Sequence, residues 1–145
     1  MIRAIGLAWV KNNNTMEANA IFKKLRLNTQ GTSLIVNAPA DYLAILEGVT
    51  FDSQPQAGKI YDFVQVFSAR QAELEQLCAS VKDAGKYDCL FWACYPKGTG
   101  KIKSDIKRET VWTALELAGV QAVTQIAIDE TWSALRGRPS EMVGK

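Results

Sequence analysis

Apolar residues recur at intervals of three and four in two segments, which is the spacing of an amphipathic helix. They are Ala18, Ile21, Phe22 and Leu25 in the first segment, and Leu74, Leu77, Cys78 and Val81 in the second. The first helix is predicted to begin near Thr15, and the second to run from Ser68, its N-cap, to Ala84. Shorter helices are predicted at 41–46 and 105–118.

Short runs of β-branched, aromatic and other apolar residues between these helices predict the strands of a sheet. The runs are 33–36, 48–51, 60–67, 87–95, 120–128 and 131–138. The segment from Cys89 to Cys94 is apolar at every position, which is typical of a strand buried on both faces. Only Asp129 and Glu130 separate the last two strands, so these strands are predicted to form a hairpin.

The alternation of strands and helices predicts an α/β fold. We expect a Rossmann-like, mostly parallel sheet flanked by helices, with a C-terminal antiparallel hairpin. From Ile21 to Arg138 this order resembles a reduced class I methyltransferase fold, which by itself implies no activity. The 145 residues fit one domain, predicted at 16–138, with an N-terminal appendage at 1–15 and a tail at 139–145.

The chain contains no histidine and three cysteines, at positions 78, 89 and 94. The cysteines lie in apolar segments without the spacing of metal ligands, which predicts reduced thiols in the core. Without histidine there is no histidine-based triad, and we predict no metal site. No apolar run is long enough to cross a membrane, and no cleavage site follows the apolar start, so the predicted location is the cytoplasm.

Positive charge is concentrated between Tyr95 and Arg108, directly after the most apolar strand. This run carries a net charge of +4, whereas the whole chain carries +2. A basic loop that leads into a helix favours an anion, because the free amides and the dipole of the helix start add to the lysines. The candidate anion-binding residues are Lys97, Gly100, Lys101, Lys103, Ser104 and Arg108. The alternative is a solvated charge run that only keeps the loop soluble.

Two cofactor-binding motifs are incomplete in this chain. Gly98–Lys101 resembles a phosphate-binding loop, but Tyr95 and Ile102 stand where the motif requires glycine and Ser or Thr. The turn after the first strand contains Pro39 and no glycine, although such folds bring a cofactor close to the backbone there. Asp52 has the chemistry to hold a ribose, but without the glycines we predict no S-adenosylmethionine site of the usual kind and no cofactor.

Three motifs resemble a bacterial family labelled domain of unknown function 3052. They are Tyr95-Pro96-Lys97, Lys103-x-Asp105-x-x-Arg108 and the run from Asp129 through Trp132 to Arg136. The resemblance implies a degenerate methyltransferase-like fold and brings no established reaction, substrate or cofactor. It also implies that residues 1–15 are an appendage, because relatives begin near Met16. Gly137 departs from the family, which has a bulky residue there, and this puts the packing of the last strand in question.

A candidate pocket is predicted beside the basic loop, lined by Asn37, Tyr95, Asp129, Trp132 and Arg136. Trp132 is expected to pack against Trp112 in the core. The alternative is that both join Tyr95 in a stacking surface for a nucleotide or single-stranded nucleic acid. As neighbours in a tight turn, Asp129 and Glu130 are expected to point apart into water, which argues against catalysis.

The leading hypothesis is a non-enzymatic or cryptic binding module whose basic loop, 97–108, holds a small anionic ligand or a nucleotide. One alternative is a remnant methyltransferase-like enzyme. Another is an interaction protein whose loop docks an acidic partner. Nucleic acid is weakly indicated and a membrane is not, and the sequence does not specify an oligomeric state.

Overall fold

The computed structural model describes residues 17–145, so the predicted appendage at 1–15 lies outside the described residues. One five-stranded sheet forms the centre of the fold. Its strands are β1 (Ser33–Val36), β2 (Tyr61–Phe67), β3 (Gly85–Pro96), β4 (Gln121–Ala127) and β5 (Trp132–Arg138). The helices are residues 17–25, α2 (Ala40–Ile45), α3 (Gln71–Ser80), α4 (Arg108–Leu117) and a short 3₁₀ turn, η1 (Ser140–Met142). No helix in residues 17–145 is long and apolar enough to cross a membrane.

The sheet is mixed, which corrects the prediction of a mostly parallel sheet. The strand order is β1-β2-β3-β5-β4. The pairs β1–β2 and β2–β3 are parallel, whereas β3–β5 and β5–β4 are antiparallel. The predicted C-terminal hairpin is present, but its last strand inserts between β3 and β4. One reversed strand therefore makes two antiparallel pairings, and β4 still runs parallel to β3.

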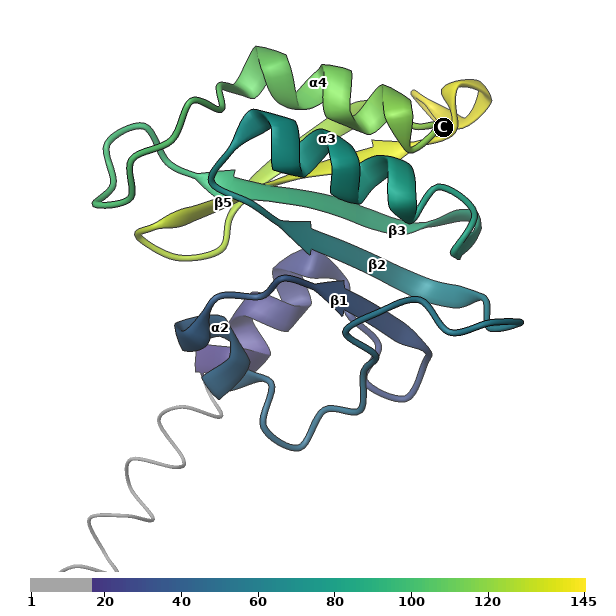
Figure 1. Ribbon diagram of the computed structural model, residues 1–145. Coiled ribbons are helices and arrows are strands. Elements are labelled where there is room, and N and C mark those ends of the chain that lie inside the picture. The colour runs from purple at the N-terminus through teal and green to yellow at the C-terminus, as the bar shows by residue number, and fades with distance from the viewer. Residues whose placement is uncertain (1–16) are drawn as a thin grey trace, which may run out of the picture.

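Helices cover both faces of the sheet (Figure 1). The side chains of β2 alternate between the two cores, with Val64 and Val66 on the side of α3 and α4, and Phe63 and Phe67 on the other. Helix 17–25 and α2 close this second side. The predicted helical apolar residues all lie in these cores or pack against them, since burying their stripe is what stabilises each helix.

α3 begins three residues later than the predicted N-cap, Ser68. The Ser68 hydroxyl accepts a hydrogen bond from the Arg70 amide at 3.1 Å and donates one to the Glu73 carboxylate at 2.7 Å. Ser68 therefore closes a turn before the helix. The first-turn amide of Gln71 is capped instead by Asp105, whose Oδ1 lies 2.8 Å away.

α4 begins at Arg108, although the sequence predicts a start at 105 with Ser104 as the N-cap. The Ser104 hydroxyl accepts a hydrogen bond from the Ile106 amide at 3.0 Å, which is a local turn that competes with a helix. Lys107 is the N-cap, and its amide donates to the Thr110 hydroxyl at 2.9 Å. The basic run is therefore almost entirely loop.

Two predicted connections also differ from the structure. Segment 48–51 forms no strand, and only Asp52 makes an isolated parallel bridge, to Leu34. The connection between β4 and β5 comprises residues 128–131 rather than two residues, because Asp129 folds it into a wider turn. Its Oδ1 accepts hydrogen bonds from two following amides, each at 2.8 Å.

Gly137 resolves the packing question that the family resemblance raises. A Cβ at this position would lie 2.4 Å from Cγ2 of Val120 and 3.1 Å from Cδ2 of Leu115. The side chains of Val120 and Leu115 thus occupy the space that a larger residue would need. Glycine is required here because of close packing, not because of an unusual backbone conformation.

Candidate ligand-binding site

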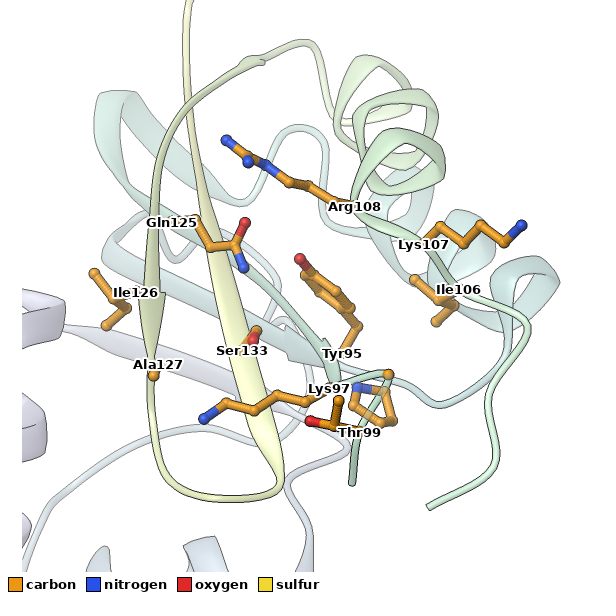
Figure 2. A pocket seen from close by; sticks show the side chains of 12 residues that line it. Tyr95, Lys97, Thr99, Ile106, Lys107, Arg108, Gln125, Ile126, Ala127 and Ser133 are labelled. Carbon is orange, nitrogen blue, oxygen red and sulfur yellow. The ribbon is translucent and has the colours of Figure 1, made fainter. Parts of the chain in front are cut away.

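A cavity of about 770 Å³ lies at the carboxyl-terminal ends of β3 and β4, beside the start of α4 (Figure 2). We call it the α4 cavity. Its lining residues are Tyr95, Pro96, Lys97, Gly98, Thr99, Ile106, Lys107, Arg108, Gln125, Ile126, Ala127 and Ser133. Three of the twelve are cationic and none is acidic. Its position agrees with the general rule that α/β sheets bind ligands at the carboxyl ends of their strands.

Strand register places the neutral polar residues of the cavity side by side. Tyr95 on β3 pairs with Ser133 on β5, and Ser133 pairs in turn with Ala127 on β4. Gln125 precedes Ala127 by two positions and so points to the same face of the sheet. This is the face that α4 covers, and Arg108 extends over it from the first turn of that helix (Figure 2).

The polar side chains of the α4 cavity have no partners within residues 17–145. The hydroxyls of Tyr95 and Ser133 and the amide of Gln125 make no hydrogen bond there. The ion pairs of these residues join Lys59 to Asp52, Lys86 to Asp62 and Arg138 to Asp88, so the cavity's cations are not neutralised. Residues 1–16 contain no Asp or Glu that could neutralise them.

Tyr95 is the most informative of these groups, because it is only 5% exposed. Its ring packs in the core beneath α3 and α4, and its hydroxyl points into the cavity between Gln125 and Arg108 (Figure 2). Burial raises the pKa of Tyr95, and the positive charge of Arg108 opposes this rise only in part. The hydroxyl is therefore protonated at neutral pH and available to a ligand.

The start of α4 adds backbone donors to the same cavity. The amide of Arg108, which lines the cavity, belongs to the first turn, where no intrahelical acceptor exists; Glu109 belongs to the same turn but does not line the cavity. The Lys107 side chain points away from the space between Tyr95 and Arg108 (Figure 2). The positive charge of the cavity thus comes from Arg108 and the helix start at one end and from Lys97 at the other (Figure 2).

The predicted anion-binding residues fall into two groups. Lys97 and Arg108 line the α4 cavity, whereas four others do not: Gly100, Lys101, Lys103 and Ser104. The Gly100 amide donates to the Lys97 carbonyl at 3.0 Å and closes a turn. Lys101 and Lys103 are exposed on the outer part of the loop.

Of the predicted pocket residues, only Tyr95 lines the α4 cavity. Asn37 lies at the end of β1, where its amide donates to the Phe67 carbonyl at 2.8 Å and to Glu73 at 3.1 Å. It lines a separate cavity of about 290 Å³. Asp129 lies in the β4–β5 turn, beside another cavity that it shares with Lys24.

The last two predicted pocket residues lie on the other face of the sheet. Trp132 is buried there against Phe67, with the ring centroids 5.3 Å apart. Arg136 is half-buried, its Nε has no partner within the described residues, and burial lowers its pKa. Alternation along β5 places both side chains on the face opposite Ser133 and Leu135.

The predicted packing of Trp112 against Trp132 is wrong, and so is the alternative stacking surface. Trp112 is 51% exposed on α4, whereas Trp132 is buried on the far side of the sheet. The ring of Tyr95 faces the core rather than solvent. The three aromatic rings therefore belong to three different environments.

The sequence did not predict Lys107, Gln125 and Ser133 as lining residues. Lys107 belongs to the basic run but was not among the predicted anion-binding residues. Gln125 lies on β4 and Ser133 on β5. Their approach to Tyr95 depends on the insertion of β5 beside β3, which no local pattern encodes. A polar residue at an inward position of a strand, such as Ser133, was the one available signal.

The cysteines and the described acidic residues offer no reactive group to this site. Burial raises the pKa of Cys78 to about 12 and that of Cys89 to about 11, and it raises the pKa of Cys94 further. All three are free and lie in or against the core, as predicted, and they are protonated at neutral pH. Residues 17–145 contain no cluster of three or more Cys, Asp or Glu side chains that could hold a metal ion.

The end of β1 does not fit S-adenosylmethionine. Asn37 and Ser68 both bond to the Glu73 carboxylate, so the polar groups at this strand end already have partners. Asp52 accepts hydrogen bonds from Lys59 at 2.8 Å and from the Tyr61 hydroxyl, and both lower its pKa. The acid that could hold a ribose is thus already engaged.

The fold is similar to methyltransferases of known structure. An S-adenosylmethionine-dependent methyltransferase from Clostridium acetobutylicum superposes with a TM-score of 0.53 and 6% identity, covering 86% of this chain and 92% of that one. A methyltransferase from Aquifex aeolicus superposes with a TM-score of 0.50 and 12% identity, covering 83% of this chain and 88% of that one. The Methanococcus jannaschii fibrillarin pre-rRNA processing protein superposes with a TM-score of 0.49 and 12% identity. The match covers 74% of this chain and 66% of fibrillarin, so the chain spans about two thirds of that protein.

Comparison with protein-family models finds no match, and comparison with curated proteins finds none either. The resemblance to domain of unknown function 3052 therefore stays a prediction. At identities this low, a structural similarity shows the fold and not the activity. The chain has an α/β fold with a five-stranded mixed sheet flanked by helices, and this fold is similar to that of the two methyltransferases.

Proposed function

We propose that this protein is a binding module for a small anionic ligand, which it holds in the α4 cavity. The observation that carries the proposal is the charge of that cavity: the side chains of Lys97 and Arg108 contribute two cations, and no carboxylate lines it. Cations without partners beside a helix start form a field that attracts an anion. The cavity volume is in the range of sites for small organic ligands.

Each group of the cavity has a binding role that its chemistry supports. The Arg108 guanidinium can donate two parallel hydrogen bonds to an oxyanion, and the Lys97 ammonium adds a second charge. The amides of the first turn of α4 can donate to the same oxyanion. None of the lining residues is a histidine, a carboxylate or a cysteine, so the cavity lacks an ordinary general base. This favours binding over catalysis.

A remnant methyltransferase-like enzyme is the second candidate, and the fold similarity favours it. The cavity is less consistent with this candidate. The groups at the end of β1 that could hold the cofactor bond to one another, whereas the groups of the α4 cavity have no partners within the described residues.

The proposal predicts that anions stabilise the folded protein and that Arg108 and Lys97 are required for this. Inorganic phosphate and phosphate esters should raise the midpoint of thermal unfolding, because only the native state has the cavity. The Lys97→Gln, Arg108→Gln double variant should bind about tenfold more weakly or worse, since hydrogen bonds to charged groups contribute about 1.5–3 kcal/mol. Calorimetric titration measures the affinity.

The matched control is the Lys101→Gln, Lys103→Gln double variant, which removes the same charge from the same loop but outside the cavity. It should bind within about twofold of wild type at physiological salt, because screening weakens exposed charges at a distance. If both double variants lose affinity equally, the loop attracts anions only through its overall charge. If no anion shifts the midpoint, the proposed function is wrong.

A further inference from the structure

We infer that the ligand of the α4 cavity is a phosphomonoester of a small polyhydroxylated compound, that is, a sugar phosphate or a polyol phosphate. The phosphoryl group would lie at the first turn of α4, beside Arg108. The hydroxyl-bearing part would lie over Tyr95, Ser133 and Gln125. This inference rests on the proposed function and specifies its ligand class.

The first argument is that the cavity has two chemically different zones. Arg108 and the amides of the α4 start form a cationic zone at one end of the cavity, whereas Lys97 lies at the opposite end (Figure 2). Tyr95, Ser133 and Gln125 form a neutral, hydrogen-bonding zone on the sheet below. A bare inorganic anion would use only the first zone. A ligand that uses both must carry a charged group at one end and neutral polar groups at the other.

The second argument is that two largely buried side chains present unpaired hydroxyls to the neutral zone. Tyr95 is 5% exposed and Ser133 is 4% exposed, and within residues 17–145 neither hydroxyl has a hydrogen-bond partner. Neither oxygen is among the buried unpaired atoms of residues 17–145, so both hydroxyls open onto the cavity, where a ligand can bond to them. A hydroxyl donates one hydrogen bond and accepts two, so hydroxyl groups of a ligand match the hydroxyls of Tyr95 and Ser133 and the amide of Gln125.

The third argument concerns charge. A phosphomonoester carries a charge of about −1.5 to −2 at pH 7 and has three acceptor oxygens. The unpaired guanidinium of Arg108 and the free amides of the helix start provide donors and positive charge for this group, and Lys97 adds a second positive charge at the other end of the cavity. A monocarboxylate has half the charge and fewer oxygens, so it would leave part of this cationic zone unpaired.

The fourth argument is that the cavity offers no surface for a base. Nucleotide and single-strand binders stack bases on exposed aromatic rings. Here Trp112 and Trp132 do not line the cavity, and the ring of Tyr95 is packed in the core. The aliphatic part of the lining comes from residues such as Ile106 and Pro96. A nucleobase would therefore gain little binding free energy from this cavity.

The test is a calorimetric titration of the full chain with a matched set of compounds. Ribose 5-phosphate, glucose 6-phosphate and glycerol 3-phosphate are compared with inorganic phosphate, gluconate, ribose and adenosine monophosphate. We expect at least one of the three esters to bind tenfold or more tightly than inorganic phosphate and gluconate. Ribose should show no binding at the same concentration, and adenosine monophosphate should not exceed ribose 5-phosphate.

Two variants separate the neutral zone from the cationic zone. Tyr95→Phe removes only a hydroxyl and should weaken ester binding about fivefold while leaving the affinity for inorganic phosphate unchanged. Gln125→Ala should act in the same direction, and Gln121→Ala, an exposed glutamine on the same strand outside the cavity, should have no effect. Equal losses for esters and inorganic phosphate in Tyr95→Phe and in Gln125→Ala would overturn the assignment of the neutral zone.

The outcomes distinguish this inference from the proposed function. If inorganic phosphate binds through Arg108 but none of the three esters binds more tightly, the binding module stands and the ligand class is wrong. The ligand class is also wrong if gluconate equals the best ester, or if adenosine monophosphate binds tenfold more tightly than ribose 5-phosphate. If no compound binds, both proposals fail.

Discussion

At the scale of single residues, Gly137 controls how closely β5 approaches α4. The Gly137→Ala variant places a Cβ 2.4 Å from Cγ2 of Val120 and 3.0 Å from its Cβ. Because Val120 is branched and held between a strand and a helix, it has little room to move. We expect the free energy of unfolding to fall by about 1–3 kcal/mol, measured by urea denaturation.

The control for this variant is Gly98→Ala, since no atom lies within 4 Å of a Cβ at position 98. This variant should change the free energy of unfolding by less than about 0.5 kcal/mol. If Gly137→Ala is as stable as Gly98→Ala, then Val120 yields more easily than its packing indicates.

A second residue-scale prediction concerns the ion pair of Asp88 and Arg138. Arg138 donates from Nε to Oδ1 at 2.9 Å and from Nη2 to Oδ2 at 2.8 Å. These hydrogen bonds hold the pKa of Asp88 below its usual value. A carboxyl whose pKa is lowered by folding stabilises the protein above its unfolded pKa, about 3.9, and loses this contribution as the pH falls through the folded pKa.

Arg138→Gln should therefore be less stable than wild type at pH 7, and the difference should shrink as the pH falls below about 4. Urea denaturation at several pH values measures this difference. Lys86→Gln is the comparison, because Lys86 and Asp62 form a more exposed pair whose loss should cost less. A difference that stays constant with pH would mean that Arg138 acts through packing and not through the carboxylate.

At the scale of elements, Asp105 connects the basic loop to the start of α3. Its carboxylate accepts the Gln71 amide at 2.8 Å, and the Gln71 side chain donates to the Thr110 carbonyl of α4 at 2.8 Å. These two bonds join α3, the loop and α4 near the α4 cavity. Asp105→Ala should lower the free energy of unfolding by about 0.5–2 kcal/mol, as removal of a helix cap does.

Hydrogen exchange gives the local measurement for Asp105→Ala. The Gln71 amide should lose protection, while amides in the middle of β3 should keep theirs. Asp105→Asn retains an acceptor oxygen and should keep most of the stability. Uniform loss of protection in Asp105→Ala would indicate global unfolding in place of the loss of one cap.

The same elements show which features a sequence can predict. Helical apolar spacing located α3 because the buried stripe of Leu74 and Cys78 is a local property. The predicted starts of α3 and α4 are wrong. The Gln71 amide at the start of α3 is capped by Asp105, which lies 34 residues away in the sequence and had been assigned to the start of α4. A local window identifies Ser68 and Ser104 as caps, but it contains no information about a distant competitor.

The sequence likewise predicts only some of the residues that line the α4 cavity. The charge run identified Lys97 and Arg108, and the end of the most apolar strand identified Tyr95. Gln125 and Ser133 were missed because strand register brings them to Tyr95, and a sequence that predicts an antiparallel last strand does not specify its neighbours or its register. Charge clusters are visible along a chain, whereas a neutral polar zone forms only when strands pair.

At the scale of the whole molecule, the candidate site does not lie where the glycine turn of the similar folds brings a cofactor close to the backbone. The sheet superposes on methyltransferases, yet unpaired polar groups gather at β3, β4 and α4 and not at the end of β1. At the end of β1, the side chains of Asn37 and Ser68 both donate hydrogen bonds to the Glu73 carboxylate. A cofactor would have to break these bonds without gaining the close backbone approach that glycines permit, because Pro39 lies in this turn.

We therefore expect calorimetric titration to detect no S-adenosylmethionine binding at micromolar concentration, under conditions in which phosphate esters bind to the α4 cavity. Glu73→Ala, which frees Asn37 and Ser68, should not create such binding, since Pro39 and the engaged Asp52 remain. The Lys97→Gln, Arg108→Gln double variant should lose the esters without any change toward S-adenosylmethionine. Micromolar binding of this cofactor that Glu73→Ala alters and the double variant does not would assign a cofactor site to the end of β1 and favour the methyltransferase-like alternative.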